Sequence, residues 1–595
     1  MKTLLFVAFT LVCFAFSPAA HAVVPAPDGG YPGFNTAEGQ NALLSLTTGT
    51  GNSAVGAFSL VSDTTGSFNT GVGIGALLLN VGGILNNGSG NTAIGALALL
   101  SNSTGTGNTA DGAFALASNT IGADNTAVGS GALLSNISSD NTAVGRNALT
   151  SNIGGAHNTA VGSFALASNT TIAGVSGERN TAIGDSALIN NATASDNTAI
   201  GFEALQSDTS GDENAAVGVF ALLHNTDGSN NTAVGVNALD NNVHGGSNTA
   251  VGRLALHSNV VGDNTAVGFN ALGSDNTGTP NTAIGAQALE SDTTGGTNTA
   301  VGFGALSSNQ VGGDNVAVGH NALSSNTTSS NTAVGFEALM SNQTGSANVA
   351  VGRIALFSAT TNDSSNTAVG TEALQGLTTG IGNVALGVDA GSNLTGGSTN
   401  IYIGNAGAAT ESNITRIGSG QTKTFIAGIR GATTGNNDAI AVVIDSAGQL
   451  GTVSSSRRYK TEIKPMDKAS ESILALKPVS FRYKVHKDAT PQFGLIAEQV
   501  AEVNPDLVIY DADCKPYTVR YDAVNAMLLN EFLKEHKTVQ EQQAMIIALK
   551  TNDAKQEARM AQQQKQIETL TAAVQKVSAQ LEVSKAEPQT VLNNH

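Results

Sequence analysis

Most of the chain repeats one short pattern of polar and apolar positions. The pattern is N-[TV]-A-[VI]-G-x-x-A-L-x-S-N, and it recurs 22 times from Asn35 to about Asn405. Most copies begin 16 to 18 residues apart, and two gaps of 22 residues, after Asn69 and after Asn158, contain extra loop residues. A fixed period with loop insertions predicts a solenoid, in which each copy packs against its neighbours.

Each copy predicts short extended segments joined by turns. Thr-Ala-Val-Gly, as in Thr126 to Gly129, alternates small and β-branched residues and predicts a strand. The following x-x-Ala-Leu predicts a second strand or a half-turn, and Ser-Asn-x-x-Gly predicts a turn. We expect Ala, Val, Ile and Leu to stack into a thin dry core, and the lead asparagines to form a ladder of amides. The fold class is therefore mainly β, with a parallel β-roll or solenoid shaft of 22 repeats over residues 35–405.

The pattern changes twice after the repeats. Residues 406–453 predict a β-rich connector, with strands over 424–429 and 439–444 and turns over 435–438 and 446–451. Residues 454–525 predict a small α+β domain.

Residues 526–585 predict a coiled coil, followed by a tail over 586–595. Seven of the eight a positions of its heptad are apolar, although several d positions are polar. The a positions are Phe532, Val539, Ile546, Asp553, Met560, Ile567, Val574 and Leu581, and the d positions are Leu528, Glu535, Gln542, Leu549, Gln556, Gln563, Leu570 and Val577. A three-stranded coil fits this heptad, which does not exclude a dimer.

The first residues predict export. Lys2, the apolar run from Leu4 to Phe16 and the A-x-A site ending at Ala22 form a secretory signal peptide over residues 1–22, with a linker over 23–34. The alternative is a membrane anchor, but the run is short for a spanning helix. We expect no membrane span after signal removal, and a secreted or bacterial surface or envelope location. One cysteine, Cys514, then remains and leaves no internal disulfide.

Composition and charge narrow the classes of function. The chain has 595 residues, 70 glycines, no tryptophan and 4% aromatic residues, which suits a stacked repeat better than a large globular core. The net charge is -18, and the acidity lies before Ser454, where 27 Asp and Glu face 8 Lys and Arg. Because phosphates would be repelled, we expect no nucleic-acid partner.

The repeats themselves offer little chemistry. Their N-x-[ST] triplets match glycosylation sites, but the repeat already requires Asn and Thr. Acidic turns such as 207–209 and 212–213 do not recur as a ligand set, so we expect no metal and no cofactor. Five histidines fall in turns or at variable places, and we expect them to be solvated: His157, His224, His244, His257 and His320.

One stretch contains candidate residues for bond-making chemistry. In Ser454-Ser455-Ser456-Arg457-Arg458-Tyr459-Lys460, a hydroxyl at Ser455 and an amine at Lys460 lie five residues apart. A lysine can activate a serine if burial lowers its pKa, and a strand with a bend would let the two meet. The alternative is a basic surface turn, which these seven residues alone favour.

Two resemblances extend this reading. The repeats resemble the heads of trimeric autotransporter adhesins, which are left-handed parallel β-rolls with three chains side by side. The repeats of those heads are usually shorter, and their C-terminal membrane barrel has no counterpart here. From Ser455 the chain resembles the intramolecular chaperone, auto-processing domain of phage tailspikes, in which an opening S-D-x-R-x-K-x-x-I precedes G-x-I-A-x-E/Q-V. The matching segments here are 455–463, Phe493 to Val500, Pro505 to Val508 and Val519 to Tyr521.

The second resemblance implies a homotrimer whose C-terminal domain assists assembly and then cuts itself off. It implies Ser455 as the nucleophile, Lys460 as its base and Ser454-Ser455 as the cleavage site. Ser456 departs from the family, where many relatives carry an acidic residue.

Three functions remain open. The first is a secreted trimeric, adhesin-like fibre that self-cleaves before Ser455, with an unidentified surface ligand. The second is a structural fibre whose trimerisation domain stays attached. The third, an enzyme with a carbohydrate site on the shaft, is disfavoured by the absence of tryptophan.

Overall fold

The computed structural model describes residues 31–82, 87–172, 174–360, 363–429, 434–435, 438–484 and 490–584. The predicted signal peptide, most of the linker and the tail lie outside these residues. The chain divides into two compact units, one up to Thr424 and one from Phe425 onward. We describe each unit by itself.

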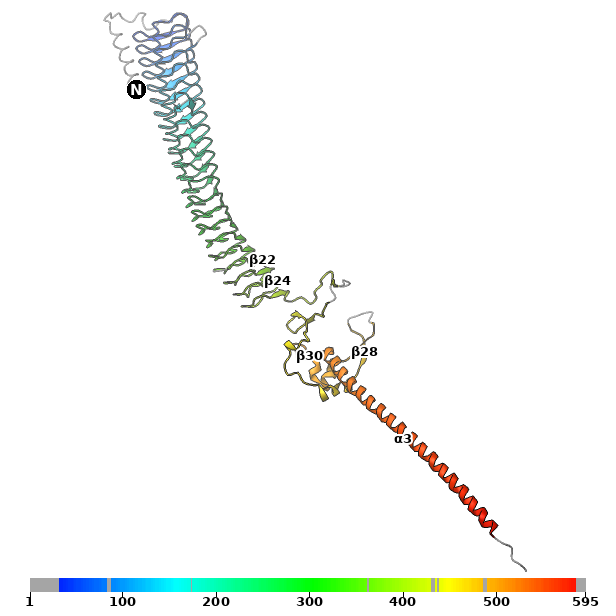
Figure 1. Ribbon diagram of the computed structural model, residues 1–595. Coiled ribbons are helices and arrows are strands. Elements are labelled where there is room, and N and C mark those ends of the chain that lie inside the picture. The colour runs from blue at the N-terminus through cyan, green and yellow to red at the C-terminus, as the bar shows by residue number, and fades with distance from the viewer. Residues whose placement is uncertain are drawn as a thin grey trace, which may run out of the picture. The chain divides into compact units, whose positions relative to one another are not determined.

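The first unit is a parallel β-solenoid, as predicted. Its coils stack through a 23-stranded parallel sheet in which each strand pairs with the next along the chain (Figure 1). The strands are β1 (Thr36–Glu38), β2 (Ser53–Val55), β3 (Thr70–Val72), β4 (Thr92–Ile94), β5 (Thr109–Asp111), β6 (Thr126–Val128), β7 (Thr142–Val144), β8 (Thr159–Val161), β11 (Thr181–Ile183), β12 (Thr198–Ile200), β13 (Ala215–Val217), β14 (Thr232–Val234), β15 (Thr249–Val251), β16 (Thr265–Val267), β17 (Thr282–Ile284), β18 (Thr299–Val301), β19 (Val316–Val318), β20 (Thr332–Val334), β21 (Val349–Val351), β22 (Thr367–Val369), β23 (Val384–Leu386), β24 (Ile401–Ile403) and β25 (Thr415–Ile417).

Each described copy contains one strand of the sheet. The x-x-Ala-Leu segment forms a turn, so the half-turn alternative is confirmed and the second-strand alternative is wrong. The reason is local, because the residue before Ala and the Leu itself take left-handed φ values in nearly every copy, for example +59° at Phe220 and +53° at Leu222. The insertion after Asn158 forms a small antiparallel hairpin of β9 (Thr171–Ile172) and β10 (Val175–Ser176).

The core of the solenoid is narrower than the sequence pattern predicted. The middle Ala of each strand and the Ala-Leu of each turn are fully buried in nearly every copy, as at Ala216, Ala221 and Leu222. The third residue of each strand points outward instead, and Val217 and Ile183 are more than one third exposed. The expectation that Val and Ile belong to the core is therefore wrong. Side chains alternate between the two faces of a strand, so the middle residue, alanine in nearly every strand and Tyr402 in β24, faces the inside of the coil.

The lead asparagines form a ladder, but its bonds differ from those expected. The side-chain oxygen of Asn197 accepts the backbone N–H of Asn214 at 2.8 Å, and its NH₂ group donates to the carbonyl of Gly211 at 2.8 Å. Amide-to-amide bonds are secondary, as between Asn108 and Asn91 at 3.1 Å. Each buried amide thus satisfies backbone groups of the coils that it joins.

A second buried ladder runs along the asparagine that ends the pattern. The NH₂ group of Asn242 donates to the side-chain oxygen of Asn225 at 2.9 Å and to the carbonyl of Gly245 at 2.8 Å. We call each residue of this ladder a rung. The rungs are Asp63, Asn80, Asn102, Asn119, Asn136, Asn152, Asn169, Asn191, Asp208, Asn225, Asn242, Asn259, Asp275, Asp292, Asn309, Asn326 and Asn342, and all are fully buried.

The fifth position of the repeat requires glycine for two reasons. Gly218 has a φ of +142°, which side chains rarely adopt. A Cβ atom there would lie 2.5 Å from the carbonyl oxygen of Gly235 in the next coil. Close stacking of the coils therefore depends on this column of glycines.

The second unit is mixed and contains short elements before one long helix. They are β26 (Val443–Ile444), β27 (Leu450–Gly451), η1 (Arg457–Tyr459), η2 (Asp467–Ala475), β28 (Val479–Phe481), β29 (Gln492–Gly494), α2 (Ala497–Val503), η3 (Pro505–Leu507), β30 (Val508–Tyr510), β31 (Pro516–Val519) and α3 (Tyr521–Val583). The pairs β26–β27, β28–β29 and β30–β31 are antiparallel.

The connector forms less sheet than expected. Residues 424–429 contain a turn and no strand, and only Val443–Ile444 of the predicted strand 439–444 is extended. The strand prediction over 424–429 is wrong because its apolar residues have no sheet to join, and Phe425 is 89% exposed. The predicted turn over 446–451 is confirmed up to Leu450, where β27 begins.

A small core holds the second unit together. It joins residues from the helical segments η2, α2, η3 and α3 and from the strands β30 and β31: Ile473, Val500, Leu507, Val508, Val519, Val524 and Met527. Most of α3 lies beyond this core, and its a-position residues are exposed in the single chain, with Phe532 at 65%.

Candidate processing site

A single 3₁₀ turn separates the two predicted catalytic residues. Ser455 precedes η1, and Lys460 ends it through a bond from its backbone N–H to the carbonyl of Arg457. Ser456 begins the turn, because its hydroxyl accepts the backbone N–H of Arg458. The expected strand with a bend is thus a short helical turn.

The bond proposed for cleavage lies on the surface. Ser454 and Ser455 are both exposed, and the hydroxyl of Ser454 accepts the backbone N–H of Ser456 at 3.2 Å. This small turn spans the Ser454-Ser455 peptide bond. Lys460 is exposed as well, and in the described part of this unit its amine makes no hydrogen bond with Ser455. No hydrogen bond therefore joins the hydroxyl and the amine within the described single chain.

Arg457 and Arg458 complete the basic character of the turn. The guanidinium of Arg458 lies over the ring of Tyr459, 5.6 Å from its centre, and its Nε donates to the hydroxyl of Ser456 at 3.3 Å. These two contacts hold the Arg458 side chain against its own turn.

Tertiary structure brings a different serine close to a lysine. The buried hydroxyl of Ser470 in η2 contacts the carboxylate of Glu531, and it lies 3.4 Å from Nζ of Lys534 in α3. Asn530 donates to the same hydroxyl at 2.6 Å. Sixty or more residues separate Ser470 from these partners along the chain, so no local motif could reveal them.

Electrostatics give this second pair a structural role. The hydrogen bond and ion pair with Glu531 raise the pKa of Lys534, and the same bond with Lys534 lowers the pKa of Glu531. Lys534 is therefore held protonated and cannot take a proton from Ser470. The cluster instead attaches η2 to the first turns of α3.

Histidines of the shaft have acidic partners that sequence analysis missed. Nδ1 of His224 lies 3.1 Å from one oxygen of the nearly buried Asp240, and Nδ1 of His257 lies 3.6 Å from the other. His244 similarly approaches Asp227 at 2.6 Å. The partners lie about one coil apart, so the sequence signal was a spacing of 16 to 17 residues.

These groups do not form a metal site. Among the residues that the structure describes, no group of three or more His, Cys, Asp or Glu side chains could hold a metal ion. None of the described helices is both long and apolar enough to cross a membrane.

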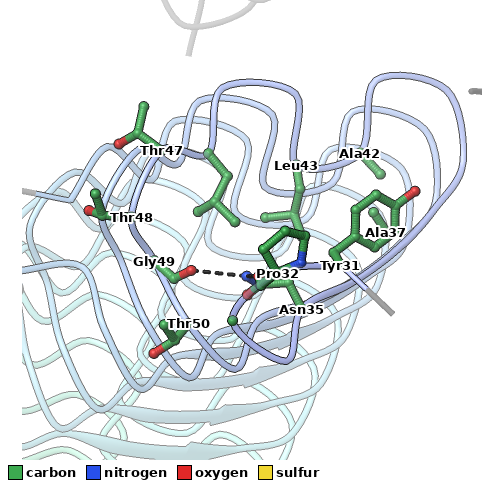
Figure 2. Close-up of a pocket in the computed structure, with 12 residues that line it drawn as sticks. Tyr31, Pro32, Asn35, Ala37, Ala42, Leu43, Thr47, Thr48, Gly49 and Thr50 are labelled. Carbon is green, nitrogen blue, oxygen red and sulfur yellow. Dashed lines mark hydrogen bonds between the residues drawn. The ribbon is translucent and has the colours of Figure 1, made fainter. Parts of the chain in front are cut away.

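A cavity of about 330 Å³ lies at the first coil of the solenoid (Figure 2). Leu43 and Leu46 line it together with Tyr31, Pro32 and the backbone of residues 47–50. The NH₂ group of Asn35 donates to the carbonyl of Gly49 at 2.9 Å beside it. Its described lining contains no acid, base or thiol apart from the Tyr31 phenol, so the cavity is the uncovered interior of the first coil.

The comparison with protein families finds a match within the second unit. Residues 455–509 match the family described as Chaperone of endosialidase. The match begins at Ser455 and includes Lys460 and the segment Phe493 to Val500, which confirms the resemblance predicted from the sequence. Val519 to Tyr521 lie beyond it. Comparisons with curated proteins and with solved structures gave no match. A chaperone-of-endosialidase segment that follows a β-solenoid shaft fits a tail-fibre-like protein.

Proposed function

We propose that this protein is an exported trimeric fibre whose C-terminal unit acts as an intramolecular chaperone and then cleaves itself from the shaft between Ser454 and Ser455. The family match that begins at Ser455, directly after the connector, carries this proposal. Export to the extracellular space or cell surface rests on the predicted signal peptide over residues 1–22. The ligand of the shaft is an unidentified surface.

Two exposed apolar rows support the trimer. The third residues of the solenoid strands stack in register, as Val217 does on Val234, and form a row of Val, Ile and Leu that Glu38 and Asp111 interrupt. The a positions of α3 form the second row. Continuous apolar surface of this kind is stabilised when further copies of the chain cover it.

The proposed cleavage is an acyl shift followed by hydrolysis. The Ser455 hydroxyl attacks the carbonyl carbon of Ser454 while Lys460, as neutral amine, takes its proton. The new Oγ–C bond replaces the C–N bond, and the proton passes to the nitrogen of Ser455, which becomes a free amine. Water then opens the ester and leaves a carboxylate on Ser454. Because Ser455 and Lys460 do not meet in one chain, assembly of the trimer would have to complete the pair.

The same observation favours a second candidate, in which the bond stays intact. The C-terminal unit would then remain as a permanent trimerisation domain, and Ser455 and Lys460 would be ordinary surface residues. The two candidates share one architecture and differ only in the fate of one peptide bond.

Intact mass spectrometry separates them. We would express the chain from Val23, with Ser455→Ala and Lys460→Ala variants, and Lys464→Ala as an exposed lysine outside the proposed pair. We expect the wild type and Lys464→Ala to split between Ser454 and Ser455, and the other two variants to stay whole. A wild-type chain that stays whole as a trimer would refute cleavage and support the permanent clamp.

A further inference from the structure

Four rungs of the second ladder carry aspartate where the others carry asparagine. They are Asp63, Asp208, Asp275 and Asp292, and each side chain is fully buried inside the solenoid. The ladder depends on the NH₂ groups of its asparagines. Each NH₂ group donates to the previous rung, to a backbone carbonyl, or to both. A carboxylate has no hydrogen to donate, so an ionised aspartate cannot make the donor contacts of an asparagine rung, whereas a protonated carboxyl keeps one donor.

Asp208 shows the problem most directly. Its Oδ1 accepts the N–H of Gly211 at 3.1 Å and the NH₂ group of Asn225 at 3.0 Å. Its Oδ2, which is buried, has no hydrogen-bond partner in the described structure. A bare carboxylate oxygen in that position would be an unpaired buried charge, whereas a carboxylic O–H offers a donor.

Asp275 and Asp292 occupy successive rungs. Oδ1 of each accepts a backbone N–H, from Gly278 at 2.8 Å and from Gly295 at 3.1 Å. Oδ2 of each accepts the NH₂ group of a lead asparagine, from Asn264 at 3.2 Å and from Asn281 at 3.3 Å. In the described residues no hydrogen bond joins the two carboxyl groups across this coil step, whereas an amide can join neighbouring rungs elsewhere. Two adjacent buried carboxylates repel, and a proton removes the repulsion.

The surroundings offer no compensating positive charge. Asp212 and Asp227 add negative charge near Asp208, and Asp227 is itself paired with His244. Asp275 adds to the field at Asp292. No ion pair involves these three rungs in the described residues. Burial raises the pKa of Asp208 to about 8 and the pKa of Asp275 and of Asp292 to about 7.

We propose that Asp208, Asp275 and Asp292 are neutral carboxylic acids in the folded shaft, and that loss of their protons opens the solenoid locally at these rungs. The shaft then contains proton-dependent weak points at these three rungs. Acidic surroundings keep the rungs closed, and neutral to alkaline surroundings loosen them. An exported fibre would meet such changes in its surroundings.

The sign follows from proton linkage. In the opened coil an aspartate ionises near pH 4, and in the closed coil it keeps its proton up to about pH 7 or 8. Opening therefore releases a proton throughout this window. The opening constant should rise about tenfold per pH unit for each rung that opens, and it should level off above the upper pH.

Hydrogen–deuterium exchange of the full chain tests the proposal. After correction for intrinsic rates, we expect peptides covering 205–213 and 272–296 to open with this slope between pH 5 and 7. The coil around Asn152, an asparagine rung, should stay flat. The variant Asp208→Asn/Asp275→Asn/Asp292→Asn should remove the slope, because asparagine is the residue that most rungs use. Asp140→Asn, at an exposed aspartate, should leave it unchanged.

Infrared spectroscopy detects the protonated carboxyl groups directly. The infrared band of a protonated carboxyl should be present at pH 6 in the wild type and reduced in the triple variant. Equal exchange slopes in both proteins, or no difference in this band, would overturn the proposal.

Discussion

The two units of this protein reach stability in different ways. The solenoid buries its Ala, Leu and Asn columns against its own next coil, so one chain supplies both sides of nearly every contact. The C-terminal unit has a small core and leaves large apolar side chains such as Phe493 and Tyr517 mostly exposed. The core of the shaft is therefore complete in a single chain, whereas the C-terminal unit leaves large apolar side chains uncovered in a single chain.

The largest predicted loss of stability concerns the shaft, at the glycine in the fifth position of each repeat. Gly218→Ala adds a Cβ 2.5 Å from the carbonyl oxygen of Gly235 at a φ of +142°. We expect a loss of about 4 kcal/mol, from backbone strain together with overpacking. Denaturant unfolding followed by circular dichroism measures it.

Gly174→Ala is the matched control for this prediction. Gly174 also has a positive φ, of +86°, but a Cβ there would meet no atom within 4 Å. We expect it to cost only about 1 kcal/mol, from strain alone. Equal losses for the two substitutions would mean that coil spacing does not require the glycine.

The dependence of the C-terminal unit on partners is tested in α3. Ile546 lies at an a position and is 51% exposed in the single chain. If three helices pack together, Ile546→Ala removes a buried side chain and costs about 2 kcal/mol per chain. The melting temperature of the helix should then fall and depend on protein concentration.

A lone helix predicts the opposite outcome. Alanine has the higher helix propensity, so Ile546→Ala would leave the helix unchanged or slightly more stable at every concentration. Gln540→Ala, at a solvent-facing heptad position, is the control. Analytical ultracentrifugation of the same samples reports the number of chains directly.

The smallest effect concerns the Ser470 cluster. Ser470→Ala removes a buried hydroxyl that Asn530 and Glu531 share, and we expect a loss of about 1 kcal/mol. Thermal unfolding of the C-terminal unit measures this change. Ser480→Ala, at an exposed serine of β28 in the same unit, should have less effect, and equal losses would show that the cluster does not hold η2 on α3.

The two units should also respond to pH in opposite directions. The pKa of Glu531 is lowered in the folded state, so its contribution is present above its ordinary pKa of 4.5 and is lost as pH falls below that value. The buried aspartates of the shaft lose their contribution as pH rises. Unfolding monitored separately in each unit between pH 3 and pH 8 should show that the C-terminal unit loses stability as pH falls and that the shaft loses stability as pH rises.

Local sequence determined much of this protein. The period of the repeats fixed a parallel solenoid of about 22 coils, because one short pattern repeated at a constant spacing has to place like residues in columns. The motifs from Ser455 to Val500 identified the chaperone-of-endosialidase segment. The uninterrupted run without Gly or Pro predicted the long helix, observed as α3.

Tertiary structure decided which face of each strand is buried and which polar groups meet. Val217 points outward because side chains alternate along the strand and the middle residue, alanine in nearly every coil, takes the inner face. Asp208 is buried because its neighbours in the ladder are 17 residues away and come together only when coils stack. Ser470 similarly meets Lys534 only because η2 packs against α3 in the folded C-terminal unit. Such contacts join residues that are far apart in the chain, and the local sequence pattern does not determine which of them come close in space.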